Sequence, residues 1–223
     1  MAATLSGRPA KTEPRYHDGN HPVAAISSSS TGAFASQNWR LLRKMAIRRI
    51  LTDEQRRRQY ARFAGDPSPH QLARYFHLDA ADKELIRELR GDHNRIGFAS
   101  TLCTARFLGV FPDVETEIPE VVLKVLARQL DLDSTDALNG YFESRQRLRH
   151  LESIRARYGF TDFSDNAAAR FRLTRWLYAL CWSGDDHPGP LIERAASWLV
   201  ANKVLLPGVT VLERFVGRIR DRA

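Results

Sequence analysis

The run RGDHNR at residues 90–95 has the side chains and the spacing to bind a phosphate group. Asp92 is placed to be the N-cap of a helix that runs from His93 to about Leu108. Residues 93–95 then occupy the first helical turn, where free backbone N–H groups and the helix dipole favour an anion. In the alternative, Asp92 caps the helix, Asn94 and Arg95 are solvated or bridge to the preceding helix, and nothing binds here.

A second group of basic side chains follows between residues 145 and 175. This segment holds eight arginines and three acidic residues, a net charge of +5. Arg145 and Arg149 are one helical turn apart, as a strip along the edge of a DNA groove requires. The alternative is a solvated helix face, but such a face normally mixes both signs of charge in i,i+4 pairs. The net charge of +5 therefore favours binding of DNA or RNA over a merely solvated face.

The whole chain is basic, and its basic residues are mostly arginine. Its 223 residues include 34 Lys plus Arg and 26 Asp plus Glu, a net charge of +8, and 29 of the 34 are arginine. Arginine suits two-point contacts with phosphate and guanine. A GC-rich coding sequence could explain the choice of arginine, but not the excess positive charge, which is typical of nucleic-acid binding. Segment 113–143 is the exception, with eight acidic and two basic residues, so one end of the domain is expected to avoid phosphates.

The sequence lacks the patterns of common enzymes and of membrane proteins. It has no nucleophile elbow, phosphate loop or glycine-rich dinucleotide turn, and its one metal-like spacing, His17 with His21, has no cysteine support. No metal and no cofactor are therefore expected. The longest apolar run, Trp176 to Trp182, is far below the roughly 18 residues that span a bilayer, and no secretory signal is evident. Together with two cysteines that fit core positions, this indicates a cytoplasmic protein.

Helix start and stop signals predict an all-α fold, a multi-helix domain over residues 45–223 that has room for a helix-turn-helix-like unit. Residues 1–44 hold three prolines and a run of four serines, and they are expected to be a disordered tail or an upstream extension with Met45 as the true start. A capping box at Ser68 and Gln71 opens one helix. The other helices are expected over residues 52–63, 82–90, 93–108, from 119 onward, and over 141–158, 165–182, 191–202 and 209–222. The side chains expected in the core include Leu148, Leu151, Ile154, Tyr158, Trp176, Tyr178, Trp182 and Trp198.

Three segments of the chain resemble a known family. They are RRILTDEQR at 48–56, RGDHNRIGFASTLCTARFLGVFP at 90–112 and LLPGVTVLERFV at 205–216. Over roughly residues 45–223 the chain resembles the N-terminal region of transposases of the Tn-three family, the replicative, cointegrate-forming transposases of bacterial mobile elements. The resemblance implies a helical DNA-binding domain that helps to recognise the terminal inverted repeats of a transposon.

The resemblance also implies what this chain does not do. The family's catalytic part is an RNase H-like fold with three metal-binding acidic residues much further along the full-length protein. None of that region is present here, so no catalytic residue is carried over, and the chain is expected to be a non-catalytic fragment of a bacterial transposase.

We therefore predict that the chain binds double-stranded DNA at transposon terminal inverted repeats, with other transposase subunits as further partners. The predicted DNA contacts are Arg90, His93, Asn94, Arg95, Arg145, Arg149, Arg170 and Arg172. One alternative is a protein-interaction module, in which the acidic segment 113–143 and the helices near Trp198 assemble the full transposase. Another is a truncated regulatory fragment that competes with intact transposase for the ends.

Overall fold

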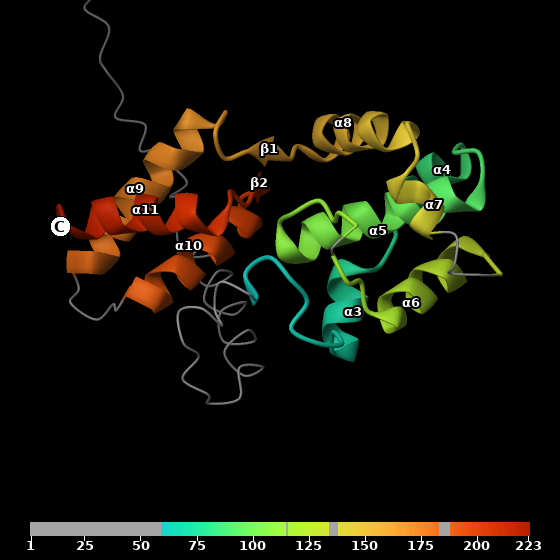
Figure 1. Cartoon of the computed structure of the whole chain (residues 1–223), viewed down its shortest axis with the longest axis horizontal. Helices are drawn as coiled ribbons and strands as arrows, with labels where there is room; N and C mark the ends of the chain where they lie inside the picture. The colour runs from blue at the N-terminus through green and yellow to red at the C-terminus, as the bar shows by residue number, and fades with distance from the viewer. Residues whose placement is uncertain (1–58, 115, 134–137, 183–187) are drawn as a thin grey trace, which may run out of the picture.

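Helices dominate the part of the chain that the structure describes, which confirms the all-α prediction (Figure 1). The computed structural model describes residues 59–114, 116–133, 138–182 and 188–223. Their elements are α3 (Pro69–Tyr75), α4 (Ala80–Arg87), α5 (Asp92–Leu108), α6 (Glu120–Leu130), α7 (Leu138–Phe142), α8 (Gln146–Tyr158), β1 (Thr161–Asp162), α9 (Ala167–Trp182), α10 (Pro188–Ala201), β2 (Val204–Leu205) and α11 (Val209–Arg220). The predicted tail over residues 1–44 and most of the predicted helix over 52–63 lie outside the described residues.

Capping boxes fix where α3 and α4 begin. At α3, Ser68 and Gln71 exchange the two side-chain-to-backbone hydrogen bonds of the box, as predicted. Asp79 and Asp82 exchange the same two bonds at α4. Because the second box sets the start of its helix, α4 begins before the predicted residue 82, and it ends before the predicted residue 90.

The long helix α5 begins one residue earlier than predicted. The N-cap is Gly91, with φ +81°, and within the described residues no side chain caps the helix. The prediction that Asp92 is the N-cap is therefore wrong. Asp92 lies inside the first turn, and its carboxylate forms an ion pair with Arg95 at 3.5 Å. Gly109 ends the helix as predicted, in the left-handed conformation with φ +75°.

A glycine in the middle of α5 lets α7 approach it closely. A Cβ atom at position 97 would lie 2.0 Å from Cγ of Tyr141, far inside van der Waals contact. Tyr141 is fully buried. Gly97 lowers the helix propensity of α5, but its missing side chain makes the space that the Tyr141 ring fills.

The helix predicted over residues 141–158 is in fact two helices, α7 and α8. Between them, Ser144 Oγ accepts a hydrogen bond from the backbone N–H of Gln146 at 3.2 Å, a local bond that competes with continued helix. Leu151 and Ile154 are buried and Tyr158 is partly buried, as predicted. Leu148 was predicted to be buried but is 67% exposed, because the buried face of α8 is formed by His150, Leu151 and Ile154 and Leu148 lies in its first turn beside that face.

The buried apolar side chains form two clusters, one in each group of helices. We call α3 to α8 the first lobe and α9 to α11 the second lobe (Figure 1). The first core includes Phe76, Ile86, Ile96, Leu102, Leu126 and Ile154. The second core includes Leu173, Leu177, Leu191, Leu199, Leu212 and Val216.

A short parallel sheet joins the two lobes. β1 follows α8, and it pairs in parallel with β2, which follows α10. The backbone N–H of Leu206 donates to the carbonyl of Gly109 at 2.8 Å, so the end of α5 is tied to the chain before α11. Leu205 belongs to the first core and Val204 to the second. No sequence pattern predicts these strands, because each is two residues long.

The second lobe begins with a cap that differs from the predicted one. Asn166 Oδ1 accepts a hydrogen bond from the backbone N–H of Ala169 at 2.8 Å, which is the pattern of an N-cap. Asp165, predicted to open the helix, instead accepts a hydrogen bond from the Ser164 hydroxyl at 2.9 Å. The amide of Asn166 thus sets the start of α9.

The four aromatic side chains predicted to be core are divided between core and surface. Trp176 and Trp198 are partly buried and pack against the second core. Trp182 is 71% exposed and Tyr178 is 39% exposed. The core prediction is wrong for Trp182 and Tyr178. The face of α9 that packs inward is formed by Ala169, Leu173 and Leu177 instead.

Candidate nucleic-acid interface

Arg95 joins the beginning of α5 to the end of α4. Its Nε–H donates to the carbonyl of Leu89 at 3.0 Å, and its Nη2 donates to the carbonyl of Arg87 at 3.4 Å. These carbonyls lie where α4 has ended, so the guanidinium takes the place of the missing helical donors. The alternative in which Arg95 bridges to the preceding helix is therefore what the structure shows.

Asn94 makes a similar internal connection. It is 8% exposed, its Nδ2 donates to the carbonyl of Arg90 at 2.8 Å, and its Oδ1 accepts from the Ser144 hydroxyl at 3.5 Å. His93 is half-buried and folds back over Gly91, where a Cβ atom would lie 2.8 Å from the His93 ring. Arg90 is exposed. The RGDHNR run thus ties together α4, α5 and the turn before α8.

Two of the predicted arginines on α8 project into solvent. Arg145 and Arg149 are both exposed, and neither has a hydrogen bond or ion pair with the described part of the chain. Arg147 lies between them in sequence but points elsewhere, since its Nη2 donates to the carbonyl of Pro112 at 2.9 Å. The guanidinium groups of Arg145 and Arg149 are therefore both available to donate hydrogen bonds to a phosphate.

A buried ion pair fixes α8 against α4 and α5. The Asp82 carboxylate, with a side chain 2% exposed, accepts hydrogen bonds from Arg106 at 2.9 and 3.1 Å and from the Tyr158 hydroxyl at 2.7 Å. Burial raises the pKa of Asp82, but the hydrogen bonds from Arg106 and Tyr158 outweigh it, so the pKa lies below its ordinary value. Burial also raises the pKa of the nearby Cys103 thiol to about 12, which is typical of an unreactive core cysteine.

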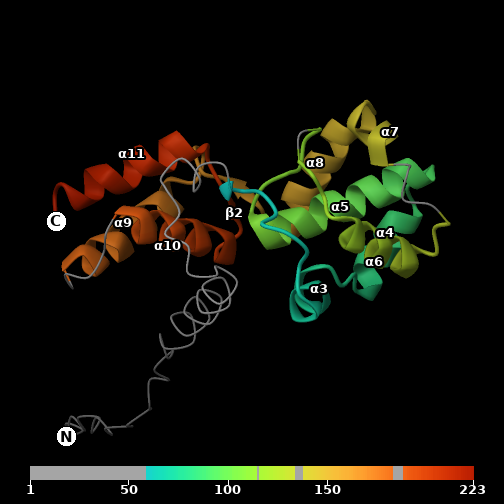
Figure 2. The ribbon, with the colours of Figure 1, turned by 60° about the horizontal axis from the view of Figure 1, so that its bottom comes forward.

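The basic helix α8 and the helix α6 of the acidic segment lie on opposite sides of the first lobe. Figures 1 and 2 both show α8 on one side of α5 and α6 on the other. The acidic segment 113–143 contains α6, and its described carboxylates are exposed at Asp113, Glu117, Glu120, Asp131, Asp133 and Glu143. An anionic polymer along α8 would therefore be separated from the carboxylates of α6, such as Glu120, by the thickness of the lobe. Asp113 and Glu143 lie closer to α8, because Arg147 bonds to the carbonyl of Pro112 and Glu143 is two residues before Arg145.

The two predicted contacts on α9 differ from one another. Arg170 is half-buried, and its Nη1 donates to the carbonyls of Phe163 and Ser164. Arg172 is exposed and has no partner among the described residues. Of the eight predicted contacts, Arg145, Arg149 and Arg172 are therefore the ones whose guanidinium groups are free for an outside ligand, together with exposed Arg90.

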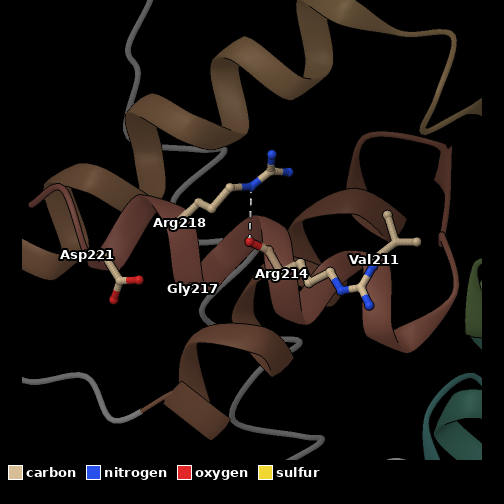
Figure 3. Close-up of a pocket in the computed structure, with 5 residues that line it drawn as sticks. All are labelled: Val211, Arg214, Gly217, Arg218 and Asp221. Atoms are coloured by element: carbon tan, nitrogen blue, oxygen red, sulfur yellow. Dashed lines mark hydrogen bonds between the residues drawn. The ribbon is translucent and has the colours of Figure 1, made fainter.

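Helix α11 adds a basic surface that the sequence prediction missed. Arg214 and Arg218 project from it one turn apart, and Val211, Gly217 and Asp221 complete the lining of a shallow pocket there (Figure 3). Arg218 Nε donates to the Arg214 carbonyl at 3.3 Å. The spacing of these arginines, with Leu212 and Val216 buried on the other face, was the signal that could have found this surface.

The described part of the chain has neither a candidate metal cluster nor a candidate membrane span. Among the described residues, no three His, Cys, Asp or Glu side chains are grouped so that they could hold a metal ion. In the same part of the chain, no helix has the length and apolar composition needed to cross a membrane. His17 and His21 lie outside the described residues.

Comparison with known proteins places the chain in a family. A family model described as Domain of unknown function (DUF4158) matches residues 50–219. The chain belongs to this family. Its match extends across both lobes, from before α3 into α11, so the two cores are parts of one recurring unit.

The curated relatives of this family member are transposases. The transposase for transposon gamma-delta of Escherichia coli (strain K12) is 42% identical over 175 residues, which are 78% of this chain and 17% of the relative. The transposase for transposon Tn1546 of Enterococcus faecium is 31% identical over 179 residues, 79% of this chain and 17% of the relative. That for Tn501 of Pseudomonas aeruginosa is 31% identical over 162 residues, 70% of this chain and 16% of the relative. These matches confirm the resemblance to Tn-three family transposases, and the chain spans 16 to 17% of the length of these relatives.

Proposed function

We propose that this chain binds duplex DNA at the terminal inverted repeats of a transposon, as the non-catalytic, end-recognising part of a transposase. The observation that carries the proposal is the pair Arg145, the N-cap of α8, and Arg149 within it, both exposed and without a hydrogen-bond or ion-pair partner among the described residues. The similarity to transposases supports a role in transposition. Exposed arginines one turn apart, on the side of α5 away from α6, provide the electrostatic attraction on which DNA binding depends.

The proposal gives different tasks to the eight predicted contacts. Arg145, Arg149 and Arg172 contact phosphates directly, because their guanidinium groups are exposed. Asn94, Arg95 and Arg170 hold the helix junctions that position those arginines, since each is hydrogen-bonded to a backbone carbonyl. Arg90 and His93 stand at the N-terminus of α5, where a phosphate can approach. Phosphate contacts position the protein, and base readout needs a second surface.

The exposed face of α11 is the candidate for that second surface. Arg214 and Arg218 are both exposed, and arginine paired with guanine is the commonest specific contact in the major groove. The segment between α10 and α11 covers residues 202–208, longer than the three or four residues of a standard helix-turn-helix. The α10–α11 pair is therefore helix-turn-helix-like rather than a member of that motif.

The test removes two phosphate contacts and measures the salt dependence of binding. In Arg145→Ala/Arg149→Ala, we expect weaker binding to every duplex, and a slope of log K against log salt that is flatter by about 2, because each phosphate contact adds about 0.9. The matched control is Arg74→Ala/Arg128→Ala, which loses the same charge from exposed positions on α3 and α6. An α8 variant that binds with the same affinity and slope as this control would contradict the proposal.

A further inference from the structure

One face of α9 carries large side chains that DNA binding does not use. Phe171 is 64% exposed, Tyr178 is 39% exposed and Trp182 is 71% exposed. They lie on one side of the helix at spacings of seven and four residues, opposite the buried Leu173 and Leu177. A line of exposed aromatic side chains marks an interaction surface rather than an ordinary solvated face.

An arginine completes this surface, which we call the α9 stripe: Phe171, Arg175, Tyr178 and Trp182. The Arg175 guanidinium lies 6.0 Å from the centroid of the Phe171 ring, and the Tyr178 and Trp182 rings are 6.3 Å apart. The sixteen residues of α9 include three arginines and no acidic residue. Tryptophan, tyrosine and arginine are the residue types that contribute most to protein interfaces.

The order of residues in the stripe is self-complementary. Phe171 and Trp182 are equally far from the midpoint between residues 176 and 177, and so are Arg175 and Tyr178. We propose that a second copy of this chain covers the α9 stripe, with the two α9 helices antiparallel about a two-fold axis. Phe171 then lies opposite the partner's Trp182, and Arg175 opposite the partner's Tyr178, which places a cation beside an aromatic ring.

The exposed aromatic rings favour a second copy over duplex DNA at this face. In a duplex the flat faces of the bases are stacked inside, so three exposed aromatic rings would find few partners there. Each α9 carries three arginines and no acidic residue, so repulsion between like charges opposes the pairing, and it is offset by the aromatic contacts and by the contact of Arg175 with the partner's Tyr178. Because α9 is only about 24 Å long, two stripes bury less than the roughly 1,600 Å² of a standard interface. We expect a weak dimer, with a dissociation constant on the order of 10 µM.

The first experiment is light scattering on the full chain without DNA, from about 1 to 300 µM. We expect the mass to rise from monomer to dimer, and Trp182→Ala to raise the dissociation constant by about tenfold or more. The matched control is Leu148→Ala, which removes an apolar side chain of similar exposure, 67%, from α8, and should leave the dimer unchanged. The proposal would be overturned if the chain stays monomeric, or if Trp182→Ala and Leu148→Ala weaken the dimer equally.

The second experiment tests the antiparallel register in a Cys181→Ser background, in which the buried Cys103 remains. A Phe171→Cys chain is mixed with a Trp182→Cys chain under mild oxidation, so that the two thiols lose two electrons and two protons to added oxidised glutathione and form one disulfide. Both changes remove an aromatic side chain of the stripe and weaken the dimer, so the chains are mixed at about 300 µM, above the weakened dissociation constant. We expect a cross-linked dimer in the mixture and far less with either chain alone, because equivalent positions in an antiparallel pair lie about 16 Å apart along the helices. No excess of cross-linking in the mixture would refute this register.

These measurements contain no nucleic acid, so they are independent of the proposed DNA binding. A dimer that forms in a chain unable to bind DNA would leave the inference standing. A chain that stays monomeric, and whose tryptophan fluorescence is quenched by a single-stranded oligonucleotide less strongly after Trp182→Ala, would instead assign the stripe to nucleic acid and overturn the proposed dimer.

Discussion

At the scale of single residues, hydrogen bonds decide the role of the RGDHNR run. The sequence pattern allows Asn94 and Arg95 either to face a ligand or to bridge helices, and the two possibilities differ only in side-chain direction. The structure directs both inward, to the carbonyls of Arg90 and Leu89. Sequence alone could not choose, because the accepting carbonyls are presented by the turn between α4 and α5, in which Gly91 has a φ of +81°.

Gly97 gives a prediction about packing within the first lobe. The variant Gly97→Ala places a methyl group where the Tyr141 ring lies, at 2.0 Å from Cγ, so α5 and α7 must separate. We expect a loss of about 1 to 3 kcal/mol in the free energy of unfolding, measured by urea denaturation. The control Gly217→Ala has open space around its new Cβ, and a gain of up to about 1 kcal/mol is expected from helix propensity. Equal effects of the two changes would contradict this role.

Asp82 gives a prediction about acid sensitivity. Its folded-state pKa is below the ordinary value of 3.8, so the folded state holds its proton less tightly than the unfolded state. The carboxylate therefore contributes stability that is fully present above about pH 4 and is lost as the pH falls through the folded-state pKa. Asp82→Asn should be less stable at pH 7 by about 3 kcal/mol, since it leaves Arg106 without its buried partner.

Urea denaturation of Asp82→Asn and of the unchanged chain at pH 7 and pH 3 measures this difference. The variant should lose less stability between the two pH values than the unchanged chain does. If both lose the same amount, Asp82 does not carry the acid-sensitive contribution.

At the scale of elements, helix ends were easier to predict from the sequence than helix faces. Ser68 with Gln71 and the glycines at 109 and 159 give correct boundaries, because capping depends on neighbouring residues alone. The buried face of α8 was mispredicted at Leu148, since tertiary packing selects the face of His150, Leu151 and Ile154 and leaves Leu148 beside it. The exposed Trp182 was also mispredicted, because the side of α9 that packs inward is the one that carries Leu173 and Leu177.

The junction of α4 and α5 gives a prediction that separates structure from binding. Arg95→Ala removes two hydrogen bonds to the carbonyls at the end of α4, and we expect a loss of about 1 to 2 kcal/mol in the free energy of unfolding. Under conditions where the variant is fully folded, its DNA affinity and salt slope should stay near those of the unchanged chain. A flatter salt slope in this variant would place Arg95 on a phosphate instead.

At the scale of the whole molecule, charge separation could be predicted from the sequence, but the two cores could not. The basic helix α8 and the helix α6 of the acidic segment lie on either side of α5 (Figure 2), whereas Glu143, at the end of the acidic segment, stays next to Arg145. The division into two lobes depends on long-range contacts such as the Leu206 bond to Gly109. Such contacts leave no periodic pattern in the sequence, and the α11 surface of the second lobe was missed with them.

Preference for the transposon end is the most direct test of the central claim. Fluorescence anisotropy would compare binding of the full chain to the terminal inverted repeat of its element and to a scrambled duplex of equal length, at two salt concentrations. We expect tighter binding to the repeat, with a preference that persists at the higher salt, because base contacts are less salt-dependent than phosphate contacts. Equal binding to both duplexes, or no binding to either, would contradict end recognition by this chain.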